Sequence, residues 1–248
     1  MKFSIVTAVY KSAGTVGQAI ASVATQSHQD LEHLIIEGAS GDDTLDVIKA
    51  AAHDRMVITS EPDKGIYDAL NKGIARATGD VVGLVHADDY LAHDDVLRDI
   101  AAAFADPQVE AVYGDLDYVS KTDTSRIIRH WSSGSYTPDL LVRGWMPPHP
   151  TLYLRRSVFD RIGTYDTRYR IAADYDFVLR YFSQTRAQPV YLPQVLVKMR
   201  VGGESNRSLG RLIRKSREDY SALRDSGVGG VGTLLRKNIS KLSQFRMR

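Results

Sequence analysis

Apolar runs typical of buried strands alternate with amphipathic helical segments over the first 115 residues of this 248-residue chain. Each run is almost continuously apolar, as expected of a strand that is covered on both faces. The segments between them carry apolar residues three or four positions apart, which is the spacing of one helix face. Strands and helices that alternate in this way form a parallel sheet with helices on both faces. The sequence therefore predicts an α/β fold with strands at residues 3–9, 34–37, 56–60, 80–85 and 110–113.

The first helix is expected to begin at Thr15, because Thr15 and Gln18 have the spacing of a capping box. In that motif each side chain accepts a hydrogen bond from the backbone of the other residue. Val16, Ile20 and Val23 would then lie on the buried face of the helix.

The regular alternation ends after residue 114. Residues 131–150 are rich in Ser, Gly and Pro and are predicted to form loops. Order is expected to return with a strand at 151–154, a helix at 176–182 and a last strand at 195–201.

The chain contains no cysteine. Disulfides, thiolate catalysis and zinc sites with cysteine ligands are therefore excluded, and the composition fits a reducing compartment. No apolar run approaches the roughly 18 residues that a membrane-spanning helix needs, and the N-terminus leads directly into a predicted strand instead of a signal peptide. We therefore expect a cytoplasmic protein that is soluble or peripheral to the membrane.

Residues 207–248 carry 11 Lys and Arg against 3 Asp and Glu, whereas the rest of the chain is net acidic. Apolar residues recur there at helical spacing with basic residues around them, as in helices that lie on an anionic bilayer. No zinc finger or ribonucleoprotein-type motif accompanies them, so an anionic membrane surface is favoured over nucleic acid as the partner. The alternative is a helix that packs on its own domain or pairs in a homodimer. The apolar positions are Leu209, Leu212, Ile213, Leu234, Leu235, Ile239, Leu242 and Phe245.

Two adjacent carboxylates, Asp88 and Asp89, follow the apolar run that is expected at 80–85. The edge where parallel strands end is the usual ligand crevice of an open α/β sheet. Mg²⁺ or Mn²⁺ is typically held by one or two carboxylates together with phosphate oxygens of the substrate. The pair therefore predicts a metal-assisted site for a phosphorylated ligand, with a solvated turn before a helix cap as the structural alternative.

The first half of the chain contains four short blocks in order: Ser4-Ile-Val-Thr-Ala-Val-Tyr-Lys11, Leu34-Ile-Ile-Glu-Gly-Ala-Ser40, Ser60-Glu-Pro-Asp-Lys-Gly-Ile-Tyr-Asp-Ala-Leu-Asn-Lys-Gly73 and Ala87-Asp-Asp89. Together these blocks resemble inverting GT-A glycosyltransferases of the large family-two group. Two later blocks, His149-Pro-Thr-Leu-Tyr-Leu154 and Ala172-Ala-Asp-Tyr-Asp-Phe-Val-Leu-Arg180, resemble the acceptor-side segment of bacterial exopolysaccharide and lipopolysaccharide sugar transferases in that group.

The resemblance implies an α/β GT-A fold, in which a Rossmann-like, mostly parallel sheet carries helices on both faces. It also implies three parts of the chain. Residues 1–115 would be the nucleotide-sugar-binding half, and residues 116–206 the loop-rich, acceptor-binding and catalytic half of the same domain. Residues 207–248 would form the basic amphipathic helical tail.

Catalysis is assigned by the resemblance to Asp174, which matches the catalytic aspartate of the family. It would take the proton from the acceptor hydroxyl, on the face of the sugar opposite the leaving diphosphate. On the residues alone, Asp174 also fits a cap of the helix that follows. Asp176 is the nearest competitor for the catalytic role.

The resemblance also implies a divalent cation, Mn²⁺ or Mg²⁺, because a departing diphosphate needs a cation to absorb its developing charge. Asp89 would ligate this metal, and Asp88 would bind the ribose or assist at the metal. His149 is a further candidate ligand. The alternatives for His149 are a place in the acceptor pocket or the ordering of a proline-rich loop.

A nucleotide-diphosphate sugar, UDP-sugar above all, is the donor that the resemblance implies. Glu37 stands where the family usually has Asp, and the pair Asp63 and Lys64 also fits a plain surface turn. Asn71 also fits a role in capping or bracing the sheet. The segment 200–205 is expected to be a flexible lid from which Arg200 can meet a phosphate. The donor-binding candidates are Thr7, Ala8, Tyr10, Glu37, Asp63, Lys64, Asn71 and Asp88.

The expected function is inverting, metal-dependent, non-processive transfer of a sugar to a hydroxyl of a lipid-linked or polysaccharide acceptor in cell-envelope glycan biosynthesis. The expected location is the cytoplasmic face of the membrane. A sugar-nucleotide nucleotidyltransferase is one alternative, although residues 9–14 are a poor version of its Gly-rich loop. A catalytically silent binding module is another, and the joint presence of Asp88, Asp89 and Asp174 argues against it.

Overall fold

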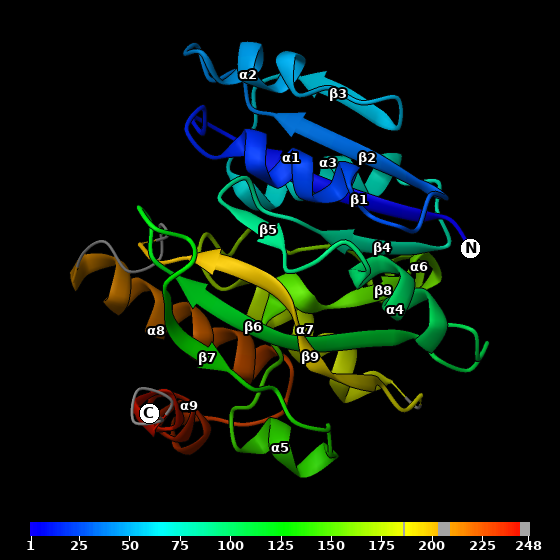
Figure 1. Cartoon of the computed structure of the whole chain (residues 1–248). Helices are drawn as coiled ribbons and strands as arrows, with labels where there is room; N and C mark the ends of the chain where they lie inside the picture. The colour runs from blue at the N-terminus through cyan, green and yellow to red at the C-terminus, as the bar shows by residue number, and fades with distance from the viewer. Residues whose placement is uncertain (186, 203–208, 244–248) are drawn as a thin grey trace.

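The structure is a computed structural model that describes residues 1–185, 187–202 and 209–243 (Figure 1). Its strands are β1 (Phe3–Val9), β2 (Leu31–Glu37), β3 (Met56–Ser60), β4 (Val81–Leu84), β5 (Asp89–Leu91), β6 (Ala111–Val119), β7 (Ile127–Trp131), β8 (Tyr153–Arg155) and β9 (Val190–Arg200). Within the described residues these nine strands form one sheet in the order β3-β2-β1-β4-β8-β6-β9-β5, and β7 pairs with β6. The sheet runs from β3 at the top of Figure 1 to β6 and β7 lower down.

Most strands of the sheet share one direction. β3, β2, β1 and β4 pair in parallel, and so do β6 and β9. The short β8 lies antiparallel between β4 and β6, so that β6 and β9 point the same way as β1. β5 and β7 are antiparallel to their neighbours. This arrangement confirms the predicted α/β fold with a mostly parallel sheet.

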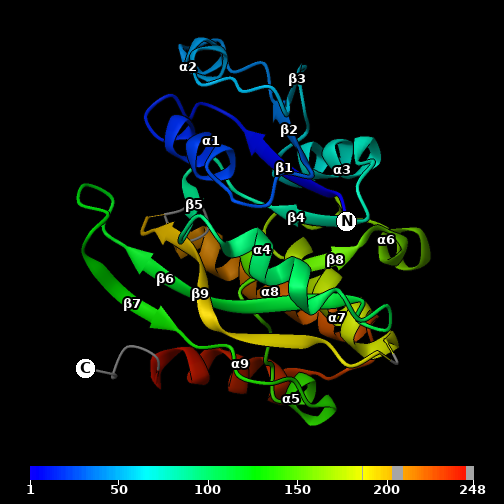
Figure 2. The same ribbon diagram turned by 45° about the vertical axis from the view of Figure 1, so that its right-hand side comes forward.

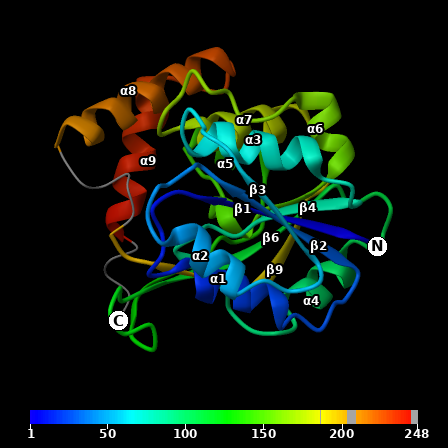
Figure 3. The same ribbon diagram turned by 90° about the horizontal axis from the view of Figure 1, so that it is seen from above.

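Helices cover both faces of the sheet. They are α1 (Val16–Ala24), α2 (Thr44–Ala50), α3 (Ile66–Arg76), α4 (Val96–Ala103), α5 (Pro138–Val142), α6 (Arg156–Ile162), α7 (Ala173–Gln184), α8 (Leu209–Asp225) and α9 (Val231–Ser243), with a 3₁₀ turn η1 (His149–Thr151). Figure 3 shows α3, α6, α7 and α8 on one side and α1, α2 and α4 on the other. Two separate apolar layers result, one between each set of helices and the sheet.

Local sequence accounts well for the strands of the first half. The bounds predicted for β1 and β3 agree with the structure, and all seven residues of β1 are buried. Gly83 allows β4 to approach β8 closely, since a Cβ at that position would lie 2.1 Å from Cε1 of Tyr153. The strand predicted at 110–113 is longer, because β6 continues to Val119 through its pairing with β7 and β9.

The predicted capping box at the start of α1 is wrong. Thr15 is the N-cap residue, but its side chain makes no capping hydrogen bond. Its hydroxyl instead lies 3.5 Å from the carbonyl oxygen of Ser12. The Gln18 side chain is also engaged elsewhere, because its Oε1 accepts a hydrogen bond from Arg200 at the end of β9.

The second half is more regular than its Ser, Gly and Pro content suggested. The segment predicted as loops contains α5 and the start of η1, and the strand predicted at 151–154 is η1 followed by β8. The last strand begins at Val190 instead of residue 195, and the helix predicted at 176–182 is the longer α7. Half of the predicted lid, residues 203–205, lies outside the described residues, and Arg200 is the last residue of strand β9 instead of part of a flexible segment.

The C-terminal helices pack on the domain. α8 contacts α7, and α9 contacts α8, and Figure 2 shows α9 below β7 and β9 at the foot of the molecule. Ala222 and Leu223 of α8 are fully buried in the main apolar cluster. Asp219 and Lys237 join the two helices through a buried ion pair, with Oδ2 and Nζ 2.9 Å apart. Among the described residues, no helix has both the length and the apolar character to cross a bilayer.

Candidate active site

The loops that follow β1 and β2 meet at the edge where these strands end. Tyr10 directly follows β1 and is 57% exposed. A Cβ at Gly38 would lie 2.4 Å from Oδ2 of Asp63 and 3.2 Å from Cδ2 of Tyr10, so both side chains lie against the backbone of this glycine. Lys11 and Ala39 adopt positive φ angles of 48° and 54°. Such backbone strain is concentrated at binding sites.

Glu37, at the end of β2, holds this edge together. Its carboxylate accepts hydrogen bonds from the backbone N–H groups of Ala39 and Ser40, at 3.1 and 2.7 Å, and from the hydroxyl of Ser60 at 2.5 Å. Burial opposes the ionisation of Glu37, but the hydrogen bonds from Ser40, Ser60 and Ala39 outweigh it and hold its pKa below the ordinary value. Glu37 therefore fixes the shape of the loop after β2.

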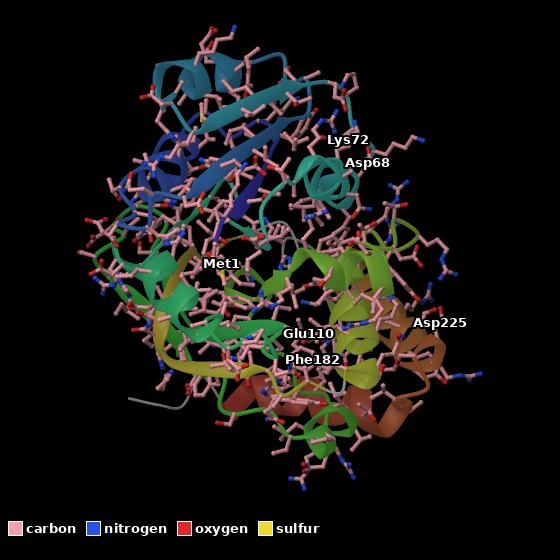
Figure 4. All side chains as sticks on the ribbon, turned by 90° about the vertical axis from the view of Figure 1, so that its right-hand side faces the viewer. Met1, Asp68, Lys72, Glu110, Phe182 and Asp225 are labelled. Atoms are coloured by element: carbon pink, nitrogen blue, oxygen red, sulfur yellow. The ribbon has the colours of Figure 1, made fainter. Side chains whose placement is uncertain are left out.

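Asp63 and Lys64 lie in the loop before α3. Oδ1 of Asp63 accepts the N–H of Gly65 at 2.8 Å, and Oδ2 of Asp68 accepts the N–H of Lys64 at 3.0 Å. Lys72 lies one turn beyond Asp68 on α3, with Nζ 3.7 Å from its Oδ2 (Figure 4). The side chain of Lys64 is exposed. The loop is thus held through its backbone while the Lys64 ammonium faces solvent.

Three other donor-binding candidates are engaged within the fold. Thr7 is fully buried, and its hydroxyl lies 2.9 Å from Nε2 of His33. Ala8, in the same strand, is also buried. The Asn71 side chain donates to the carbonyl of Tyr165 at 2.8 Å and accepts the N–H of that residue at 2.9 Å, so Asn71 joins α3 to the second half of the chain.

Asp89 is a buried carboxylate at the start of β5. Its exposed fraction is 0%, and neither carboxylate oxygen has a hydrogen-bond partner among the described residues. Burial, and then the neighbouring Asp88, raise the pKa of Asp89 well above its ordinary value, while Arg200 acts in the opposite direction. The guanidinium of Arg200 donates to the carbonyl of Asp88 at 2.5 Å and to Gln18. Arg200 therefore fixes the backbone that presents both carboxylates.

Asp174 lies in the first turn of α7, at the end that faces α3. Its Oδ1 accepts the N–H of Tyr175 at 2.8 Å and lies 3.3 Å from the hydroxyl oxygen of Tyr67. That hydroxyl donates to the carbonyl of Ile171 at 2.8 Å. Burial, followed by Asp174, raises the pKa of Tyr67 well above its ordinary value. The N-cap of α7 is Ala172, so Asp174 is not the capping residue.

Two buried histidines, His86 and His149, are influenced electrostatically by Asp174. The rings of His86 and His149 are 5.1 Å apart, and Nδ1 of His86 and Nε2 of His149 are buried without a hydrogen-bond partner among the described residues. Burial lowers the pKa of His86, with Asp88 and Asp174 acting in the opposite direction. Burial and then His86 lower the pKa of His149 to about 4. Both imidazoles are therefore neutral at neutral pH, and each can accept a hydrogen bond.

Asp176 is occupied by a structural ion pair. Its Oδ2 lies 2.8 Å from Nε of Arg180 on the same helix, and the Asp176 side chain is only 6% exposed. Arg180 also donates to the carbonyl oxygens of Ile162 and Thr164, at 2.6 and 2.7 Å. Asp176 thus helps to anchor the loop after α6, whereas Asp174 is the carboxylate whose charge acts on His86 and His149.

A divalent cation fits this group of residues. Within the described part of the chain, no three Asp, Glu or His side chains are gathered closely enough to hold a metal ion alone. The two unpartnered oxygens of Asp89 nonetheless have free coordinating capacity. Mg²⁺ and Mn²⁺ commonly complete their shells with phosphate oxygens of a bound substrate, so one or two protein ligands are sufficient.

Asp88 and Asp174 thus both act electrostatically on His86, whose ring lies 5.1 Å from that of His149, and Asp89 follows Asp88 in the chain. Tyr10, Gly38 and Asp63 form a separate group at the ends of β1 and β2. His86 and Gln18 were not predicted to be site residues, and Tyr67 was not predicted to contact Asp174. Of these, His86 had the clearest local signal, since it stands two positions before Asp88 in the chain.

The chain is similar to several known proteins. The model of the family described as Glycosyl transferase family 2 matches residues 4–172. The PGL/p-HBAD biosynthesis glycosyltransferase of Mycobacterium tuberculosis is 32% identical over 209 residues, which are 82% of this chain and 79% of the relative. An uncharacterized glycosyltransferase of Nostoc sp. is 30% identical over 185 residues, which are 70% of this chain and 57% of the relative.

Solved structures share the architecture. TarS 1-349 of S. aureus in complex with UDP-GlcNAc superposes with a TM-score of 0.73 at 18% identity, covering 92% of this chain and 66% of that chain. The mannosyltransferase PcManGT of Pyrobaculum calidifontis, in complex with GDP-Man and Mn²⁺, gives a TM-score of 0.68 at 18% identity, with 98% and 70% covered. At these identities the likeness shows the fold alone.

Proposed function

The chain belongs to glycosyl transferase family 2, and on that premise we propose that it transfers a sugar with inversion, with the help of a divalent cation, from a nucleotide-diphosphate sugar to an acceptor hydroxyl. The observation that carries the proposal is that Asp88 and Asp174, from the two halves of the chain, both act electrostatically on the buried imidazole of His86. Inverting transfer needs two separate groups, with a base on one face of the sugar and diphosphate stabilisation on the other.

Asp174 is the proposed general base. The acceptor oxygen attacks C1 of the donor sugar on the face opposite the diphosphate, and its proton passes to the Asp174 carboxylate. The bond between C1 and the diphosphate oxygen breaks, its electron pair leaves with the nucleoside diphosphate, and the anomeric configuration inverts. Tyr67 holds Oδ1 of Asp174 in place, which leaves Oδ2 for the acceptor.

Asp89 is the proposed metal ligand, with Asp88 beside it and His149 as the further candidate. A bound Mn²⁺ or Mg²⁺ would neutralise the charge that develops on the departing diphosphate. Arg200 positions this acidic segment through its bond to the Asp88 carbonyl. The Mn²⁺ in the PcManGT complex supports a divalent cation in this fold.

The donor is proposed to bind at the ends of β1 and β2, with UDP as the nucleotide. The exposed ring of Tyr10, which lies against the backbone of Gly38, offers a surface for a flat nucleobase. Asp63 lies against the same glycine, within reach of polar base or ribose atoms. Support comes from the UDP-GlcNAc and GDP-Man held by proteins of similar fold.

The proposed acceptor is a lipid-linked or polysaccharide glycan at an anionic membrane surface, which the outer face of α8 and α9 would contact. Ile213, Val231 and Leu235 are each more than half exposed there. The two helices also enclose an apolar groove of about 480 Å³, lined by Ile213, Ser216, Arg217, Tyr220, Val231 and Leu234. Exposed apolar residues with arginines around them suit a bilayer with anionic headgroups.

The donor and metal proposals are tested together by thermal shift. UDP-, GDP- and dTDP-sugars are added with Mn²⁺ or with EDTA, because a donor that binds only the folded state raises its melting temperature. We expect one UDP-sugar to stabilise the protein in Mn²⁺ and not in EDTA. Stabilisation by the same sugar in EDTA would contradict the metal requirement. Release of pyrophosphate from a nucleoside triphosphate and a sugar phosphate would instead indicate a nucleotidyltransferase.

The membrane proposal is tested with the full-length chain and vesicles of zwitterionic lipid with or without about one third anionic lipid. The variant Arg214→Glu/Arg217→Glu changes exposed residues of α8, and Lys49→Glu on α2, across the sheet, is the control. We expect salt-sensitive binding to anionic vesicles that only the α8 variant loses. Equal binding by the wild-type chain and the α8 variant would refute the proposal.

A further inference from the structure

Glu218, in the middle of α8, reaches across to the start of α7. Its Oε2 accepts hydrogen bonds from the backbone N–H groups of Ile171 and Ala172, at 2.7 and 3.0 Å. Ala172 is the N-cap of α7, and Asp174 follows two residues later. A carboxylate at this place satisfies N–H groups that a helix cannot satisfy itself, and it interacts favourably with the positive end of the helix dipole.

The turn before Asp174 is held from the opposite side as well. The carbonyl of Ile171 accepts the hydroxyl of Tyr67 on α3 at 2.8 Å. Ile171 therefore has its N–H held by α8 and its carbonyl held by α3. Because Tyr67 also lies 3.3 Å from Oδ1 of Asp174, a shift of this turn would move the carboxylate directly.

α8 is itself firmly placed against the domain. Ala222 and Leu223 are fully buried, and Asp219 forms the buried ion pair with Lys237 of α9. At its C-terminal end Asp225, labelled in Figure 4, accepts the hydroxyl of Tyr169 at 2.8 Å. A rigid helix can hold a loop in one place, so α8 is a suitable support for the turn.

We propose that Glu218 is a positioning residue for sugar transfer, which holds the turn that carries Asp174. The helix α8 would then contribute to the geometry of the catalytic site. The proposal rests on the role of Asp174 as the base in the proposed function. The family match ends at residue 172, which is the second of the two residues that Glu218 holds. The helix α8, which holds the position of Asp174, therefore lies entirely beyond the segment that the family model matches.

The test compares Glu218→Ala and Glu218→Gln in the full-length chain, with separate kcat and KM values for donor and acceptor. A misplacement of about 1 Å can cost roughly 10²-fold in rate, so we expect Glu218→Ala to lower kcat by about 10- to 100-fold. The donor KM should change by less than about twofold, because the donor candidates lie on other elements. Glu218→Gln should recover most of kcat, since its amide oxygen can accept the same two N–H bonds.

Asp225→Ala is the matched control, because it removes another contact between α8 and the same loop without touching Ile171 or Ala172. It should lower the melting temperature while leaving kcat near the wild-type value. A purely structural role for Glu218 would make the two alanine variants alike in kcat once each is assayed well below its melting temperature, and that result would overturn the proposal.

A double variant separates this proposal from the assignment of the base. In an Asp174→Asn background, Glu218→Ala should cause no further loss of kcat, because the carboxylate that Glu218 positions is already absent. An additive loss would overturn the positioning role of Glu218 while the base assignment stands. A normal kcat for Asp174→Asn alone would refute the proposed base, and with it the premise of this inference.

Discussion

The hydroxyl oxygen of Tyr67 on α3 lies 3.3 Å from Oδ1 of Asp174 on α7, although 107 positions of sequence separate the two residues. The contact ties the catalytic candidate to the half of the chain that carries the donor candidates. A second link runs parallel to it, from Asn71 to the backbone of Tyr165. α3 is therefore the element that sets the distance between the two halves of the site.

Asp174→Asn should lower kcat by about 10²- to 10⁴-fold, the usual range for loss of a general base, with donor affinity within a few-fold of the wild-type value. The fold should survive, because the amide oxygen can keep the bonds to Tyr67 and Tyr175. Steady-state kinetics and donor titration measure the two effects. Asp176→Asn is the comparison, since it breaks the ion pair with Arg180 and should affect stability more than rate. A pure rate defect in Asp176→Asn would show that the assignment is reversed.

Asp89→Asn should stabilise the metal-free protein while abolishing transfer. A charged carboxylate is costly at a fully buried position and the neutral amide avoids that cost, so the free energy of unfolding should rise at a pH where Asp89 is ionised. Urea unfolding in EDTA measures this gain, and added Mn²⁺ with donor should raise the melting temperature of the wild-type protein alone. Near-normal transfer by Asp89→Asn would contradict the role as ligand.

Gly38→Ala should weaken donor binding. The new methyl would lie 2.4 Å from Oδ2 of Asp63 and 3.2 Å from Cδ2 of Tyr10, so both side chains must move. Overpacking of this kind costs about 1–3 kcal/mol, and a loss of that size in donor binding corresponds to a rise in donor KM of roughly 5- to 160-fold. Gly14→Ala, where a Cβ would meet nothing within 4 Å, is the control on a neighbouring loop. Equal donor KM values for the two variants would contradict a nucleotide site at Gly38.

Acid should destabilise the protein through His33. Burial, then His53 and Arg55, lower the pKa of His33 from 6.5 to about 3 in the folded state. The unfolded chain therefore binds more protons below pH 6.5, so the stabilising effect is complete above that pH and is lost as the pH falls towards 3. Unfolding midpoints between pH 7.5 and 4 should fall less steeply for His33→Gln than for wild type. The exposed His93→Gln should leave the slope unchanged, and equal slopes for His33→Gln and wild type would contradict this account.

Elements whose signals are local could be predicted from the amino-acid sequence. β1 and β3 have the bounds that their apolar runs predict: β1 is buried along its whole length, as a strand covered on both faces requires, and β3 is a half-exposed edge strand that pairs with β2. The pair Asp88 and Asp89 could be placed at the sheet edge for the same reason. The choice of Asp174 came from the resemblance, since an aspartate at a helix start has several local explanations.

The partners of individual side chains became known only from the three-dimensional fold. The capping box failed because Gln18 bonds instead with Arg200, 182 positions away. Asp176 and Asp174 differ by two positions, yet Arg180 engages one and Tyr67 meets the other. The basic tail shows an amphipathic pattern that suits a bilayer or a protein surface equally, and the structure packs Ala222 and Leu223 into the core. Hydrogen bonds and ion pairs depend on positions in space that distant segments supply, so periodicity, which records only a segment's own faces, could not identify them.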